Sequence, residues 1–231
     1  ELDPVPELEE VVEEGRRDAL VGDARSASEG LIGQVDLVLR PIQRPGDILE
    51  AIPGMIVTQH SGSGKSNQMF LRGFNLDHGT DFATWIDGMP VNMRTHGHGQ
   101  GYTDANFLIP EIIESLHYVK GPYHAELGDF SSAGGVHINT FHRAPDNRLQ
   151  LEMGEDNYQR LLAMGGATVA GQQLFAAIES QYFDGPWTDI DGNAQKLNSL
   201  LRLSSGDDRD RQWSITAMYY DNDWDSADQI P

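Results

Sequence analysis

The amino-acid sequence predicts a mixed α+β domain followed by a series of antiparallel β-strands, and two observations carry this prediction. Between Ala27 and Thr140, short β-type runs are broken by Gly and Pro and include one helical stretch. After Pro145, apolar and polar residues alternate along segments of about ten residues, joined by polar loops. One chain therefore combines two different β-architectures.

The first region contains one helix candidate and several strand candidates. Residues 45–47 lead into a short amphipathic helix over Ile48–Ile52, which Pro53 and Gly54 end. Two Gly-containing loops, Ser61–Ser66 and Arg94–Asp104, are the places where function is expected on a rigid scaffold. The predicted strands are Met55–Thr58, Gln68–Arg72, Ala83–Asp87, Ser115–Val119 and Val136–Thr140.

The second region alternates with the period of a β-strand that has one apolar face. Leu149, Leu151 and Met153 alternate with Gln150 and Glu152, and similar runs surround Ile178, Leu201 and Ile215. Membrane barrels show this pattern, with an apolar outer face and a polar lumen, and a soluble β-sandwich is the alternative. Four or five strands cannot close a plugged transporter barrel of about 22 strands, so on this interpretation the sequence is incomplete.

Composition excludes several classes of function. The chain carries 36 acidic and 16 basic residues, a formal charge of −20, which argues against a nucleic-acid partner. Without Cys it has no disulfide, thiolate metal site or cysteine nucleophile. No stretch approaches the roughly 20 apolar residues of a spanning helix, so a membrane role would use strands.

Four motifs follow one another in the first region. They are the helix run Asp47–Met55, the Arg-Gly-Phe strand Phe70–Phe74, the Asp-Gly hairpin Ile86–Val91, and the run from Glu114 to Thr140, with Gly121-Pro122 and Gly134-Gly135. In this order they resemble the plug domain of TonB-dependent outer-membrane receptors. The resemblance implies a flexible arm over residues 1–26, a plug over 27–145 and the first strands of an incomplete, 22-stranded barrel over 146–231.

The resemblance also implies a partner-binding segment in the arm. In this family a short segment called the TonB box pairs with the periplasmic protein TonB, and the run of Leu8, Glu9, Glu10, Val11 and Val12 resembles it. Glu residues follow at positions 13 and 14, where Val and Thr are more usual. An extended strand donor of this kind suits β-augmentation, in which backbone hydrogen bonds supply the affinity.

The loop after the hairpin, Arg94–Asp104, is rich in side chains that can bind a ligand. The resemblance implies that this loop faces the ligand. Two imidazoles, His96 and His98, could converge on a metal ion, with Asp104, or Asp77 and His78, completing the shell. The alternatives are hydrogen bonds to neighbouring carbonyls and contacts between plug and barrel. Arg94 could instead meet an anionic group. The predicted ligand-binding residues are Arg94, His96, His98, Gln100, Tyr102 and Asp104.

The resemblance implies active transport of an external metal chelate, siderophore or other scarce nutrient across the outer membrane of a Gram-negative bacterium. Its partners would be TonB, outer-membrane lipid and a small-molecule ligand, with no cofactor beyond a transported metal. No enzyme is expected: the run Ser63-Gly64-Lys65-Ser66 lacks the first Gly of a phosphate-binding loop, where Gln59 stands. The alternatives are a soluble periplasmic binding module and a metal-dependent hydrolase.

Overall fold

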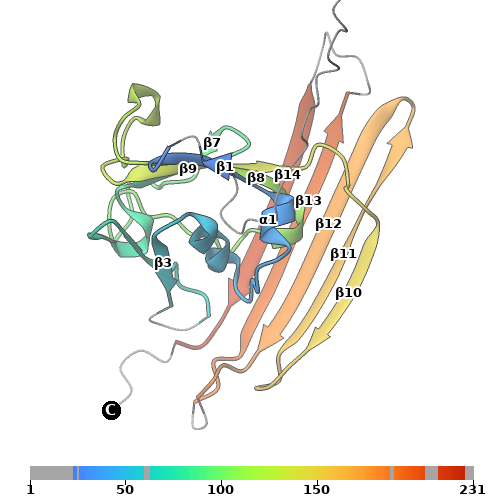
Figure 1. The fold of residues 1–231 in the computed structure, drawn as a ribbon. Helices are drawn as coiled ribbons and strands as arrows, with labels where there is room; N and C mark the ends of the chain where they lie inside the picture. Colours follow the sequence, from blue (N-terminus) through green and yellow to red (C-terminus); the bar gives the residue numbers. More distant parts are fainter. Residues whose placement is uncertain (1–22, 25, 60–62, 188–189, 206–212, 227–231) are drawn as a thin grey trace, which may run out of the picture.

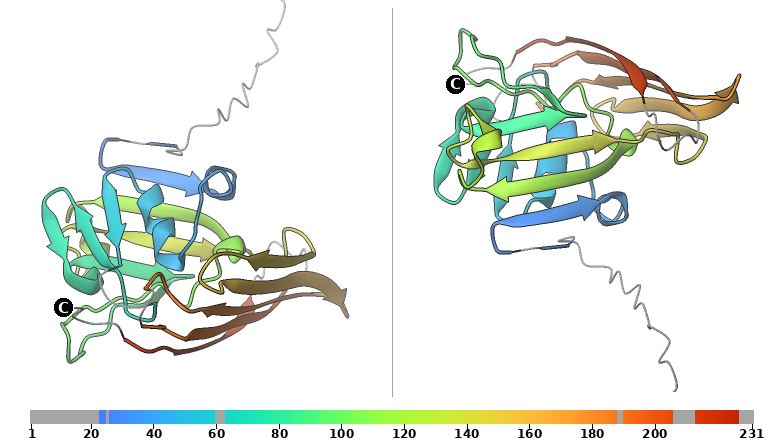
Figure 2. Two further views of the ribbon diagram at one scale, coloured as in Figure 1. Left: turned by 90° about the horizontal axis from the view of Figure 1, so that it is seen from below. Right: turned by 90° about the horizontal axis from the view of Figure 1, so that it is seen from above.

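The computed structural model describes residues 23–24, 26–59, 63–187, 190–205 and 213–226. Figure 1 shows two layers, a mixed N-terminal domain and a curved antiparallel sheet of long strands beside it. The views from below and above in Figure 2 show that this curved sheet covers one side of the domain. The two predicted β-architectures are therefore packed against each other.

A six-stranded mixed sheet forms the backbone of the N-terminal domain. Its strand order is β1-β2-β8-β9-β6-β7, with β6 parallel to β9 and the other neighbours antiparallel. The three strands predicted in this sheet are confirmed, with bounds shifted by a few residues. The strands are β1 Asp23–Ala24, β2 Glu29–Gly33, β6 Phe82–Ile86, β7 Met89–Pro90, β8 Ile113–Lys120 and β9 Gly134–Thr140.

A smaller antiparallel sheet contains β3 (Met55–Thr58), β4 (Gln68–Leu71) and β5 (Phe74–Leu76). In the described part of the chain, the four-residue helix α1 and four short 3₁₀ helices connect the strands. Within the described ranges, no helix is long and apolar enough to cross a membrane. The helices are α1 Gln34–Leu37, η1 Pro45–Ala51, η2 Asp77–Gly79, η3 Pro110–Ile112 and η4 Ala125–Leu127.

The predicted amphipathic helix over residues 48–52 is a 3₁₀ helix that begins earlier and is largely buried. Pro45 occupies its first turn, where a missing N–H costs nothing, and Asp47 caps the backbone N–H of Arg44 at 3.0 Å. Ile48 and Leu49 are both fully buried. The predicted short amphipathic helix is therefore confirmed as a 3₁₀ helix, because its apolar side chains are buried while Glu50 is exposed.

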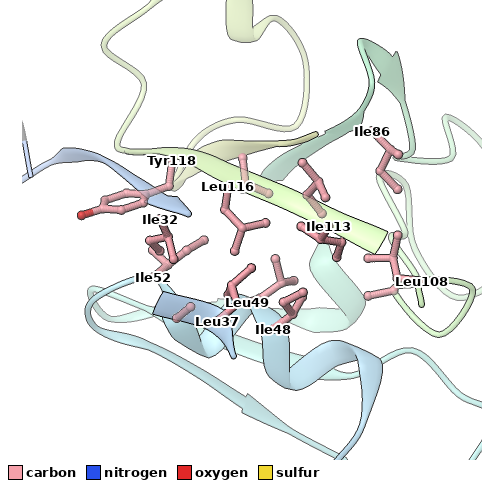
Figure 3. Close-up of a cluster of buried hydrophobic side chains, with 14 of the residues drawn as sticks. Ile32, Leu37, Ile48, Leu49, Ile52, Ile86, Leu108, Ile113, Leu116 and Tyr118 are labelled. Atoms are coloured by element: carbon pink, nitrogen blue, oxygen red, sulfur yellow. The ribbon is translucent and has the colours of Figure 1, made fainter. Parts of the chain in front are cut away.

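The core of the N-terminal domain lies between the six-stranded sheet and the helices η1 and α1. Figure 3 shows Leu49 and Ile52 from η1 and its end pointing toward Ile32, Leu116 and Tyr118 of the sheet. All five side chains are buried. Removal of such apolar surface from water stabilises a fold by about 25 cal/mol per Å², so the sheet and helices form one rigid unit.

The C-terminal sheet is an antiparallel meander in which each strand pairs with the next along the chain. Its alternating runs confirm the prediction of antiparallel strands. One strand, β11, was not predicted because its central run Leu161–Met164 is apolar on both faces. The strands are β10 Arg148–Met153, β11 Gln159–Val169, β12 Gln172–Phe183, β13 Ala194–Ser204 and β14 Ser214–Asp223.

The two faces of this sheet differ in chemistry, because one exposes apolar side chains and the other holds polar groups among buried apolar ones such as Leu162 and Phe175. The face turned away from the N-terminal domain exposes large apolar side chains, among them Leu151 at 69% and Met153 at 84% exposure. The face turned toward the domain carries buried polar and charged side chains. These are Arg160, Glu179, Lys196, Asn198, Arg202 and Ser204.

Candidate functional site

The loop after β7 is closed at its base by a small antiparallel bridge. The N–H of Met93 donates to the carbonyl of Tyr102 at 2.9 Å, and the N–H of Gly101 donates to Met93 at 2.8 Å. Gly101 has φ +84° and lies so close to Phe130 that a Cβ would stand 2.6 Å from its ring. The base is thus fixed, and residues 94–100 project from it as a tip.

A single side chain, Asn92, ties this loop to the six-stranded sheet. Its Nδ2 donates to the carbonyls of Phe82 at 3.0 Å and Gly101 at 2.9 Å, while its Oδ1 accepts from the N–H of Thr84 at 2.7 Å. Asn92 was not predicted, because its partners lie in a strand and in the far side of the loop. Its hydrogen bonds therefore fix the base of the loop to the sheet.

His78, in η2, lies beneath the loop. Its side chain is 1% exposed, and its Nδ1 lies 2.8 Å from the carbonyl oxygen of Ser66. Because a carbonyl can only accept, Nδ1 carries the proton, and the lone pair of the neutral ring is on Nε2. The backbone holds this arrangement, since the N–H of Thr103 donates to the carbonyl of His78 at 2.9 Å.

Four aromatic rings converge at the loop. The rings of His96 and Tyr102 stack with centroids 3.9 Å apart, and the ring of His98 meets that of His78 edge-on at 4.2 Å. The N–H of His98 donates to Nδ1 of His96 at 3.1 Å, and the N–H of Ser66 donates to the hydroxyl of Tyr102 at 3.2 Å. The loop tip is therefore folded back onto η2.

Three possible metal ligands come together here. Among the described residues, the ligand atoms of Asp77, His78 and His98 all lie within 4.8 Å of one another. Nε2 of His78 is 3.5 Å from Oδ1 of Asp77. His96 and Asp104, which the sequence also suggested as metal ligands, are not members of this group.

The carboxyl end of the loop faces β13 of the C-terminal sheet. Oδ1 of Asp104 accepts from the N–H of Asn106 at 2.8 Å, and Asn198 of β13 donates to the Asn106 carbonyl at 3.2 Å. Burial raises the pKa of the Asp104 carboxyl to about 6, although the hydrogen bond from Asn106 and the charge of Lys196 oppose the rise. Asp104 therefore belongs to the contact between the two layers.

The remaining predicted ligand residues lie in solvent at the loop tip. Arg94 is exposed and pairs with Asp129 at 3.2 Å, and Gln100 is exposed as well. An exposed ion pair of this kind contributes little to stability. Both side chains can therefore reorient toward a bound molecule at small cost.

A buried charge cluster joins the two layers around Arg160 of β11. Its guanidinium contacts the carboxylates of Glu111 at 2.7 Å, Glu152 at 2.8 Å and Glu179 at 2.5 Å, and Lys196 lies 3.0 Å from Glu179. Burial raises the pKa of Glu111, but the hydrogen bonds and charge of Arg160 outweigh burial and hold that pKa below its usual range. This cluster was not predicted from the sequence. The feature that could have indicated it is that Arg160, Glu179 and Lys196 are charged residues within strands that are rich in apolar residues.

A second contact joins the Asp-Gly hairpin to β13. The guanidinium of Arg202 donates to the carbonyls of Phe141 at 2.6 Å and Thr140 at 3.2 Å, to the carboxylate of Asp87, and to the hydroxyl of Thr216 at 2.9 Å. Arg202 is itself 1% exposed. Asp87 thus forms the predicted turn and also anchors it to the long strands.

A cavity of about 510 Å³ remains between the layers, beyond the charge cluster. Backbone and side chains of both layers line it, with Arg44, Asn67 and Asn106 on one side and Tyr158, Gln181 and Lys196 on the other. A space of this size accommodates a small molecule.

The fold and these contacts define the class of protein: a plug domain held by buried polar and apolar contacts against one face of an antiparallel sheet whose other face is apolar and exposed. Residues 24–136 match the family described as the TonB-dependent receptor plug domain. The chain therefore belongs to the TonB-dependent receptors. The predicted plug with a mixed sheet followed by antiparallel strands is confirmed, and the count of 22 strands stays a prediction.

Three solved structures of similar fold are considerably longer than this chain. The copper transporter OprC is 20% identical, with a TM-score of 0.67 over 90% of this chain and 32% of its own. The siderophore receptor PirA from Acinetobacter baumannii is 18% identical, with a TM-score of 0.61 over 85% and 32%. The pyoverdine receptor FpvA from Pseudomonas aeruginosa is 17% identical, with a TM-score of 0.61 over 84% and 27%. This chain spans about a third of their length.

Proposed function

We propose that the protein takes up an external ligand across the outer membrane of a Gram-negative bacterium, driven by TonB. The observation that carries this proposal is the pairing of two faces: one face of β10–β14 is apolar and exposed, and the other holds the plug through Arg160 and Arg202. The buried ion pairs and hydrogen bonds of this interface, which lie beside apolar contacts of Leu162 and Phe175, can be exchanged for bonds to water when the plug rearranges in a wet lumen. The outer-membrane lipid covers the apolar face.

The ligand is a metal chelate, a siderophore or another scarce nutrient, and it reaches the loop of residues 94–104. Two of the solved relatives are named for copper and for siderophores, which supports this class of ligand. Arg94 suits an anionic group of a chelator, because it is exposed and its ion pair with Asp129 lies at the surface. The proposed ligand-binding residues are Arg94, His96, His98, Gln100, Tyr102 and Asp104.

The chain is divided by function into an arm over 1–26, the plug over 27–145 and barrel strands over 146–231. The strand β1 at Asp23–Ala24 lies within the range given to the arm and pairs with β2, so the C-terminal end of the arm is part of the plug sheet. Leu8–Val12, which lies outside the described residues, is the proposed TonB box. TonB would pull on it and remodel the plug, so the chain itself needs no cofactor and no catalytic residue.

The soluble binding module is not favoured. Leu149, Leu151 and Met153 form an exposed apolar row along β10, continued by Ile178 and Leu201 on other strands. Soluble monomers rarely expose contiguous apolar surface of this kind. A metal-dependent hydrolase has no support beyond the imidazoles of the loop, which the transport proposal already uses.

Deletion of Leu8–Val12 tests the proposal. In cells that express the full-length protein, this deletion should abolish uptake of copper(II) or ferric siderophores that the parent protein takes up. Binding of the same compound to the purified protein should be unchanged, because the segment acts through TonB. A deletion of equal length, Arg16–Leu20, is the control and should retain uptake. Normal uptake after deletion of Leu8–Val12 would contradict the proposal.

A further inference from the structure

We propose that Asp77, His78 and His98 form a site for one borderline divalent cation, Cu²⁺, Zn²⁺ or Ni²⁺, between η2 and the loop tip. The role of this site in transport rests on the proposed function, but metal binding itself does not. The set contains two imidazoles and one carboxylate, and imidazole suits these three metals better than Mg²⁺ or Ca²⁺, which prefer oxygen.

The spacing of one ligand pair fits a metal better than it fits a hydrogen bond, and the ligand atom of His98 lies within 4.8 Å of both. Nε2 of His78 and Oδ1 of Asp77 are 3.5 Å apart, longer than the 2.7–3.2 Å usual for N–H···O. Two ligands at about 2.0–2.1 Å from a tetrahedral ion lie roughly 3.3 Å apart. The observed separation is therefore close to one edge of such a tetrahedron.

The partner of the other ring nitrogen orients His78 as a ligand. Nδ1 of His78 donates to the Ser66 carbonyl at 2.8 Å, which leaves Nε2, 3.5 Å from Oδ1 of Asp77, as the ligand atom of this ring. Metal-binding histidines usually have such a second hydrogen bond, which sets the tautomer and the ring orientation. The Ser66 backbone also binds Tyr102 through its N–H, so the same residue orients the ring and holds the loop.

The backbone at His78 is in a conformation that costs energy and places the ring in the cluster. His78 has φ 51° and ψ 41°, a left-handed conformation that costs a non-glycine residue about 1–2 kcal/mol. Such strain persists only where the surroundings enforce it and is common at ligand-binding sites. Glycine would adopt this backbone conformation without the cost. The presence of histidine instead supports a role for its side chain in binding.

His98 completes the group from the solvent side. Its ring is exposed and lies edge-on to that of His78 at 4.2 Å, and its backbone is held by the hydrogen bond to His96. Three ligands from the described part of the chain leave one tetrahedral position for water or for a donor atom of a chelating ligand. The site can therefore receive a metal from outside and release it.

The competing explanation is a proton in place of the metal, with a charged His78 paired to Asp77. That explanation gives His98 no part in the interaction, so replacement of His98 separates the two. His98→Ala is also safe for folding because the side chain is exposed, whereas His78→Ala would open a cavity in the plug.

The test is calorimetric titration of the full-length protein in detergent with Cu²⁺, Zn²⁺ and Ni²⁺ in turn. We expect one ion per chain for at least one metal, with affinity lowered at least about tenfold by His98→Ala and by Asp77→Asn. His142→Ala, an exposed histidine outside the group, is the matched control and should bind as the parent does. Absence of binding, or equal affinity of the parent and His98→Ala proteins, would overturn the proposal.

Two further measurements define the site and separate it from the transport proposal. The X-ray absorption spectrum of the bound metal should show nitrogen and oxygen donors. An identical spectrum for metal bound to the His98→Ala protein would count against the site. The protein without Leu8–Val12 should bind the metal with parental affinity, since the site lies in the plug. Failure of the uptake test with intact metal binding would remove the transport proposal alone, and the reverse result would remove the metal site alone.

Discussion

The guanidinium of Arg160 in β11 lies 2.7 Å from the carboxylate of Glu111 in η3, so a charged pair joins a barrel strand to the plug. Both side chains are largely buried, and Arg160 also binds Glu179 of the neighbouring strand β12. Burial of a charged side chain costs solvation free energy, and close partners of opposite charge are needed to offset that cost. The plug is therefore held by contacts that are strong when complete and costly when one partner is lost.

Replacement of Arg160 should loosen the plug. Arg160→Ala leaves the carboxylates of Glu111 and Glu179 without their main partner and should lower the free energy of unfolding by about 3–5 kcal/mol. Chemical denaturation of the full-length protein in detergent measures this change. Arg148→Ala, which removes a partly exposed pair with Asp146, is the control and should cost about 1 kcal/mol or less. Equal effects of the two substitutions would contradict the interpretation of Arg160 as an anchor.

Asp104 should make the plug less stable at neutral pH than at acid pH. Because burial raises its pKa in the folded protein to about 6, from about 3.8, the folded state favours the protonated carboxyl. Its favourable contribution is complete below about pH 4 and is lost as the pH rises through 6. Asp104→Asn should therefore raise Tm above pH 6 and leave it unchanged near pH 4, in thermal unfolding at several pH values. A lower Tm of the variant at pH 7 would contradict this assignment.

Gly79 should be intolerant of a side chain. It has φ +80°, and a Cβ at this position would stand 2.7 Å from the Cβ of Thr103, which holds the loop to η2. Gly79→Ala should destabilise the protein by more than the backbone strain alone, which is about 1–2 kcal/mol. Gly73→Ala provides the comparison, since Gly73 has φ +85° with open space around its Cβ position. Denaturation that shows equal losses for the two variants would mean that the close approach to Thr103 is not restrictive.

A charge on the outer face of the sheet should be poorly tolerated in a bilayer. Ile178 lies near the middle of β12 on the exposed apolar face, so Ile178→Arg should destabilise the protein in lipid by up to about 2–4 kcal/mol. Urea titration of the protein folded into phospholipid vesicles measures the loss, with Ile178→Leu as the apolar control. Equal stability of Ile178→Arg and the parent in vesicles would contradict lipid contact at this face.

Local patterns predicted much of the fold. Alternation identified β10, β12, β13 and β14, because one face of each strand is apolar and the other meets polar plug groups. It missed β11, where Leu162 and Met164 pack against the plug core while Leu161 faces outward, so that no alternation remains. The short strands β1, β2 and β5 were missed as well, since pairing across the sheets rather than their own sequence determines them, whereas β7 belongs to the predicted Asp-Gly hairpin.

The candidate site was only partly predictable for the same physical reason. The chemistry of the loop identified His96 and His98, and His78 was one of the two alternatives for completing a metal shell. The contacts of His78 with Ser66 and Thr103, and of Arg202 with Asp87, join residues far apart in sequence. Such contacts depend on the packed structure, so the sequence alone could not assign them.

The central claim is that the plug must move relative to the barrel strands for uptake, and cross-linking tests it most directly. The rings of Phe107 in the plug and Tyr220 in β14 lie 6.5 Å apart, within reach of a short bismaleimide in the variant Phe107→Cys with Tyr220→Cys. Each single substitution, treated with the same reagent, is the control. The account predicts that uptake falls to background in the cross-linked double variant and persists in both controls. Uptake at the parental rate by fully cross-linked protein would contradict it.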